Sequence, residues 1–208
     1  MLKKDVENLK IQYCRVPPYY LILKTDKTHQ NMTKKFSLFL LMSSLIINVS
    51  AQIIDLDKVN KLFSEGEYSV SQNLYQNLLN DGENKDFLIY RIANCSKNLG
   101  NSDAIYWYKL LIKNYKNSAF LQNSRKELGF IYFSNKNYSK SSLTLSEIND
   151  ESIKDDEFHF KLGYSLFTQD KYDDAKYHFY KVKDNDGRYK ILSLYYYAHI
   201  NYIQKMYN

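Results

Sequence analysis

Residues 162–179, LGYSLFTQDKYDDAKYHF, recur 34 residues upstream as LGFIYFSNKNYSKSSLTL at 128–145. In both segments a Leu-Gly pair lies within an apolar run, and a tyrosine follows the glycine nine residues later. The tyrosine position recurs along the chain at intervals of 33, 37, 34 and 35 residues, at Tyr68, Asn101, Tyr138, Tyr172 and Tyr207. A period of about 34 residues is typical of helix-turn-helix repeats. The pattern therefore predicts a stacked helical array.

Five units can be placed with this period, each consisting of two helices on either side of its turn. Their ranges are about 52–84, 85–120, 122–150, 156–184 and, for a partial unit, 191–208. Within each predicted helix, apolar residues recur at i, i+3, i+4 and i+7, which gives the helix one apolar face. The fifth unit stops where the turn to its second helix would begin. We therefore expect a truncated last repeat and a chain that is the N-terminal piece of a longer array.

These repeats resemble the tetratricopeptide repeat (TPR) family over residues 55–208, and the last two units resemble long secreted TPR proteins of Gram-negative bacterial envelopes. The resemblance implies an all-α fold, a right-handed superhelical solenoid. It also implies small residues where helices approach closely, and these repeat-packing positions are Gly129, Gly163, Ala104, Ala175 and Ala198. No unit ends in the proline usual for the family, because both prolines precede Met32. The turns must then rely on Asn, Asp and Gly.

The segment that begins at Met32 has the pattern of a secretory signal peptide. Two lysines are followed by the apolar stretch Phe36–Val49 and by a small-x-small cleavage signal that ends at Ala51. The 14 apolar residues fall short of the roughly 20 that a membrane-spanning helix needs. We therefore expect residues 32–51 to be a cleaved signal peptide and residues 1–31 to be a non-translated or disordered extension.

Charge and cysteine content support a secreted product that does not bind nucleic acid. The whole chain carries +6, but the residues after Ala51 hold 21 basic and 20 acidic side chains, a net charge of +1. The basic excess therefore belongs mostly to the leader and offers no argument for nucleic acid, which would need a basic face in the folded part. Cys95 is the only cysteine after Ala51, so neither an intramolecular disulfide nor a lipoprotein anchor is expected. We expect a protein of the periplasm or one associated with the outer membrane.

Residues 52–208 carry no pattern for catalysis, for a metal or for a cofactor. The six glycines are all explained by helix contacts and turns, which leaves no phosphate-binding loop. His159, His178 and His199 have no carboxylate or cysteine at metal-ligand spacing. The acids at 155–157 suit the N-terminus of a helix, and Cys95 is expected to be a small buried side chain. We expect no enzyme activity, no metal, no cofactor and no small-molecule substrate.

In the TPR family the first helix of each unit lines an inner, concave wall. That geometry makes the wall aromatic from the third unit onward, and the predicted groove residues are Phe130, Phe133, Phe160, Tyr164, Phe167, Tyr195, His199 and Tyr202. Aromatic rings are frequent anchors of protein interfaces, although such rings can also complete the core between repeats. Some family members hold a C-terminal carboxylate with lysines and amides. That clamp has no match here, because Asn60 has no lysine at neighbouring wall positions.

These features predict a non-catalytic protein-protein interaction scaffold or adaptor of the bacterial cell envelope, which binds a peptide or a helix in an aromatic concave groove. The alternative is a membrane-tethered structural subunit of an envelope complex, in which Phe36–Val49 stays as an uncleaved N-terminal anchor. The first helix of the fifth unit is strongly apolar over residues 194–203. We also expect association with other proteins through this open C-terminal edge.

Overall fold

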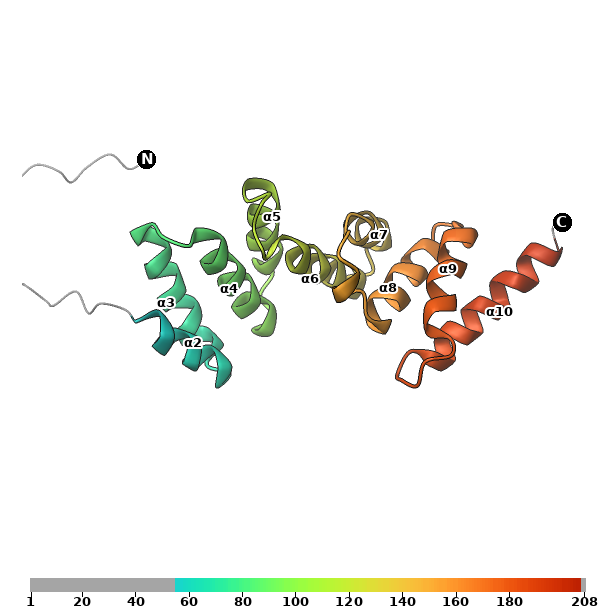
Figure 1. Cartoon of the computed structure of the whole chain (residues 1–208), viewed down its shortest axis with the longest axis horizontal. Helices are drawn as coiled ribbons and strands as arrows, with labels where there is room; N and C mark the ends of the chain where they lie inside the picture. Colours follow the sequence, from blue (N-terminus) through green and yellow to red (C-terminus); the bar gives the residue numbers. More distant parts are fainter. Residues whose placement is uncertain (1–54, 207–208) are drawn as a thin grey trace, which may run out of the picture. The chain divides into compact units, whose positions relative to one another are not determined.

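The computed structural model describes residues 55–206. The expectations for residues 1–31, for the signal peptide and for Tyr207 lie outside the described residues. Within 55–206 the chain is helical and contains no strand (Figure 1). The elements are α2 (Leu56–Ser64), α3 (Tyr68–Asp81), α4 (Lys85–Asn98), α5 (Ala104–Asn114), α6 (Leu121–Ser134), α7 (Tyr138–Ser146), the 3-10 turn η1 (Glu151–Ile153), α8 (Asp156–Phe167), α9 (Tyr172–Val182) and α10 (Lys190–Met206).

Each helix packs against the helices next to it in the sequence, from α2 on α3 through to α9 on α10. Helices α6 and α8 also touch, so the first helix of one repeat contacts the first helix of the next. This order of contacts is that of an all-α solenoid built from helix-turn-helix repeats, as the sequence predicted. Buried apolar clusters continue from one repeat into the next, so each repeat covers the apolar face of its neighbour.

The four turns inside the repeats share one backbone conformation. Each has a residue with positive φ just after the first helix, at Gly66, Gly100, Lys136 and Asp170, with φ between 58° and 87°. The following N–H bonds to a carbonyl five residues back, as in the 2.8 Å bond from Asn137 to Tyr132. This Schellman arrangement ends a helix and satisfies its last carbonyls. It gives the first helix of each of these four repeats a hydrogen-bonded end.

Gly129 and Gly163 lie where the second helix of a repeat crosses the first most closely. A Cβ at Gly129 would lie 2.5 Å from Cδ2 of Leu145 on α7, and one at Gly163 would lie 3.1 Å from Cβ of His178 on α9. Ala104 and Ala175 are buried, whereas Ala198 on α10 is exposed. Among the described residues no helix follows α10 to cover Ala198.

Gly129→Val is expected to lower the free energy of unfolding by about 1–3 kcal/mol, because overpacking in a close contact costs that much. Leu145 is fully buried, so its side chain would have to shift against its buried neighbours. Urea denaturation followed by circular dichroism measures the effect. Gly187→Val is the control, because a Cβ there meets only Asp156 Oδ2, at 3.7 Å. In a Leu145→Ala background the cost of Gly129→Val should fall, and an unchanged cost would contradict the proposed contact.

In each of the first two repeats, a hydrogen bond joins the first helix to the second. Tyr75 donates its hydroxyl hydrogen to Asn60 Oδ1, and Tyr108 donates to Asn94 Oδ1, each at 2.7 Å. Burial raises the pKa of Tyr75 to about 12 and also that of Tyr108, so both hydroxyls stay protonated and act as donors. Asn60 is therefore engaged inside its own repeat. Cys95 is buried as expected, and burial raises the pKa of its thiol to about 11.

Candidate binding groove

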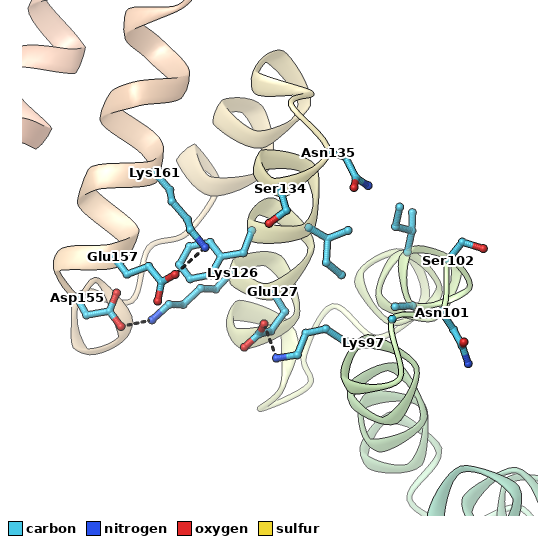
Figure 2. Close-up of a pocket in the computed structure, with 15 residues that line it drawn as sticks. Lys97, Asn101, Ser102, Lys126, Glu127, Ser134, Asn135, Asp155, Glu157 and Lys161 are labelled. Atoms are coloured by element: carbon cyan, nitrogen blue, oxygen red, sulfur yellow. Dashed lines mark hydrogen bonds and ion pairs between the residues drawn. The ribbon is translucent and has the colours of Figure 1, made fainter. Parts of the chain in front are cut away.

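A groove of about 740 Å³ opens between the turn that follows α4, helix α6 and the beginning of α8. Figure 2 shows its lining side chains, which come from these three neighbouring repeats. The lining includes the apolar side chains of Ile105, Phe130 and Ile131, which we call the floor of the groove. The sides are polar or charged. The volume is in the usual range of about 300–1,000 Å³ for ligand sites in proteins.

Phe130 is the predicted aromatic residue that the structure places in this groove. It projects from α6 and is half-buried. The Lys161 ammonium on α8 lies 3.8 Å from the centre of its ring, and the Lys126 ammonium lies 5.6 Å away. Both distances permit attraction between an ammonium and an aromatic face. The ring therefore forms part of the floor and also attracts the ammonium groups of two lysines.

Three lysines of the groove are each paired with a carboxylate. Lys97 lies 2.9 Å from Glu127, and Lys126 lies 2.7 Å from Asp155. The third pair joins Lys161 and Glu157 at 2.6 Å. Lys126 also donates to the carbonyl of Ile153 at 2.8 Å. Two of the pairs, Lys97–Glu127 and Lys126–Asp155, join different repeats and are drawn as dashed lines in Figure 2.

The two carboxylates on the α8 side remain charged and face outward. Burial raises the pKa of Asp155, but hydrogen bonds from Lys126 and from the N–H of Phe158 outweigh it, so the pKa lies below its usual value. The pKa of Glu157 is lowered in the same way, because its bond with Lys161 outweighs desolvation. The side chains of Asp155 and Glu157 are 58% and 40% exposed, whereas those of Lys126 and Lys161 are 14% and 13% exposed.

The other predicted aromatic residues do not line the groove with Phe130. The rings of Phe133 and Tyr164 lie 5.7 Å apart across α6 and α8, and Tyr164 and Phe167 contact Tyr196 of α10 at 5.3 and 5.1 Å. These half-buried rings join successive first helices. They complete the packing between repeats.

Phe160 belongs to the core and does not line an open surface. It is only 7% exposed and stacks on Tyr189 with ring centres 4.9 Å apart. Tyr195 and Tyr202, in contrast, are 59% and 62% exposed on α10. Tyr195 stacks on His199, with ring centres 5.9 Å apart. The residues predicted to line one groove therefore lie in four different places: the groove, the contacts between repeats, the core and helix α10.

The charged residues of the groove were not predicted as binding residues, although Asp155 caps the N-terminus of α8 as the sequence indicated for the acids at 155–157. A signal for two of them was present, because Glu127 and Lys161 precede Phe130 and Tyr164 by three residues, which is about one helical turn. They are also 34 residues apart, one repeat period. Combining the period with the helical turn would have placed both beside the predicted aromatic positions.

His159 and His178 meet between α8 and α9, outside the groove. Their Nδ1 atoms are 2.9 Å apart, so one ring donates a hydrogen bond to the other. Burial and then the neighbouring His159 lower the pKa of His178 to about 4. Burial also lowers the pKa of His159. At neutral pH both rings are therefore uncharged.

Over residues 55–206, no three side chains of His, Cys, Asp or Glu come together as a metal site would require. In the same range, no helix has the length and the apolar character needed to cross a bilayer.

Comparison with known proteins gives the fold. No protein-family model and no curated protein matches the sequence. The structure is similar to MamA (41-end) from Desulfovibrio magneticus RS-1, with a TM-score of 0.58 and 15% identity over 72% of this chain and 82% of that one. A double mutant of MamA RS-1 has a TM-score of 0.59 and 14% identity, over 72% of this chain and 82% of that one. A kinesin light chain structure with nearly identical TPR-like repeats, from Podosopora anserina, has a TM-score of 0.50 and 9% identity. The match covers 72% of this chain and 84% of that one. The described residues therefore have a TPR-like fold, which confirms the predicted class of fold.

Proposed function

We propose that this chain is a non-catalytic scaffold that binds a segment of another protein in the groove around Phe130. The observation that carries the proposal is an open groove of about 740 Å³ with an apolar floor and polar sides, formed by three consecutive repeats of a TPR fold. An apolar floor with a few placed polar groups is the usual form of a recognition site. Concave surfaces of stacked repeats are what repeat proteins use to bind their partners.

We also propose that the scaffold works in the bacterial cell envelope. This part rests on the sequence of residues 32–51, which has the order of a signal peptide. N-terminal sequencing of the protein purified from its host tests it. A mature chain that begins at Gln52 would support secretion, and a chain that keeps Phe36–Val49 would favour a membrane-tethered subunit instead.

The binding test blocks the groove without disturbing the core. Ser134 is exposed on α6 and lines the groove, so Ser134→Trp would fill part of it. Ser146→Trp is the matched control, because Ser146 is also exposed near a helix C-terminus but does not line the groove. We expect proteins captured by the parent chain from native envelope fractions to be recovered at least tenfold less with Ser134→Trp. Equal recovery with both variants would contradict the proposed site.

A further inference from the structure

Resting on the proposed function, we infer that the groove takes a basic peptide segment, in which an arginine or lysine stands next to an apolar residue. The partner is thus a protein that presents such a segment in an extended or helical form. Three features of the groove carry this inference: its three paired lysines already have anionic partners, the two most exposed side chains of these pairs are the carboxylates Asp155 and Glu157, and its floor is apolar.

Lys126 on α6 and Lys161 on α8 are already paired with carboxylates, so neither is free to bind an acidic ligand. Lys126 is shared between Asp155 and the carbonyl of Ile153, at 2.7 and 2.8 Å. Lys161 pairs with Glu157 and lies over the Phe130 ring. Both side chains are nearly buried. An acidic ligand would have to displace Asp155 or Glu157 from these lysines, and it would then be repelled by the displaced carboxylate.

The carboxylates, in contrast, are accessible and can accept more hydrogen bonds. An ionised carboxylate has about four acceptor sites on its two oxygens. The side chains of Asp155 and Glu157 are 58% and 40% exposed, and hydrogen bonds keep the pKa of each below its usual value. A guanidinium or ammonium that approaches from solvent therefore meets negative charge first. A guanidinium suits this rim best, because it donates several bonds in one plane.

The apolar floor indicates that the ligand also carries an apolar side chain beside its basic one. Ile105, Phe130 and Ile131 give an apolar surface directly beside the acidic rim. A leucine-sized side chain, or the aliphatic stem of an arginine, can cover this surface while the charged end reaches the carboxylates. The groove volume of about 740 Å³ limits the buried part of the ligand to a few residues. The recognised segment is therefore short.

Two fluorescein-labelled heptapeptides, acetylated and amidated at their ends, test the inference. One alternates leucine with arginine and the other alternates leucine with glutamate. Fluorescence anisotropy at 50 and 200 mM salt should show that only the arginine peptide binds, and more weakly at higher salt. Asp155→Asn combined with Glu157→Gln should weaken its binding at least tenfold. Asparagine keeps the helix cap that Asp155 gives α8, so the fold should hold.

Asp174→Asn combined with Glu83→Gln removes the same two charges from exposed positions outside the groove and should leave binding unchanged. Binding of the glutamate peptide, or equal loss in both double variants, would overturn the inferred charge preference. If Ser134→Trp blocks binding of the arginine peptide but the change at Asp155 and Glu157 does not, binding in the groove is supported and the inferred preference for basic segments is contradicted. If neither peptide binds, or if Ser134→Trp does not change binding, both the inferred charge preference and the proposed binding site are contradicted.

Discussion

Phe179→Ala is expected to lower the free energy of unfolding by about 3–5 kcal/mol, the usual cost of removing a fully buried phenylalanine. Phe179 is 0% exposed on α9. Its ring stacks on Tyr196 at 5.3 Å and lies 6.1 Å from the ring of Phe160. It also contacts the site of Gly163, where a Cβ would be 3.2 Å from Phe179 Cε1. One ring therefore joins three successive helices, α8, α9 and α10.

Urea denaturation followed by circular dichroism measures this loss. Tyr177→Ala is the matched control, because Tyr177 lies on the same helix and is 55% exposed. Its substitution should change the free energy of unfolding by only about 0.5 kcal/mol. Hydrogen exchange should show that protection falls first in α8, α9 and α10, since each repeat depends on its neighbours. Similar losses in the two variants would show that Phe179 is not the centre of this packing.

The stability of the chain is expected to decrease as the pH is lowered from about 6.5 towards 4, in part because of His178. Its folded-state pKa of about 4 lies below the ordinary value of 6.5. Between these values the unfolded chain binds a proton that the folded chain does not, so protonation favours unfolding. Above pH 6.5 neither state is protonated and the contribution is constant. The full difference corresponds to about 3–4 kcal/mol, at about 1.4 kcal/mol for each pKa unit.

The cause of this sensitivity is the position of the histidine pair. Protonating both rings would place two positive charges at the 2.9 Å contact between Nδ1 atoms. Lys154 adds to the repulsion, and Glu151 opposes it. His178→Gln should therefore reduce the slope of stability against pH between pH 7 and 5, a range above the titration of most carboxylates. His199→Gln, on α10 and outside the pair, is the control for replacing a histidine elsewhere in the chain. Equal slopes in both variants would contradict a role for His178.

Features of this protein that repeat along the chain could be predicted from its sequence. The period of about 34 residues predicted the helix-turn-helix array, and the structural comparisons confirmed that class of fold. The same periodicity drew attention to Gly129 and Gly163, which the structure places at its closest helix contacts. Such features depend on local helix geometry and on one repeated contact, so equivalent residues recur at equal spacing. The prediction for the signal peptide stays a prediction.

The tertiary structure decided which aromatic rings remain accessible and which charges meet. Phe130 and Phe160 both lie on first helices, yet Tyr189 covers Phe160 whereas Phe130 stays at the groove. The pair Lys97–Glu127 joins residues 30 positions apart, and Lys126–Asp155 joins residues 29 apart. Periodicity of the sequence determines the helices and their apolar faces. The exposure of a ring and the partner of a charge depend on how neighbouring repeats are placed, because burial and ion pairing require atoms from different repeats to meet in space.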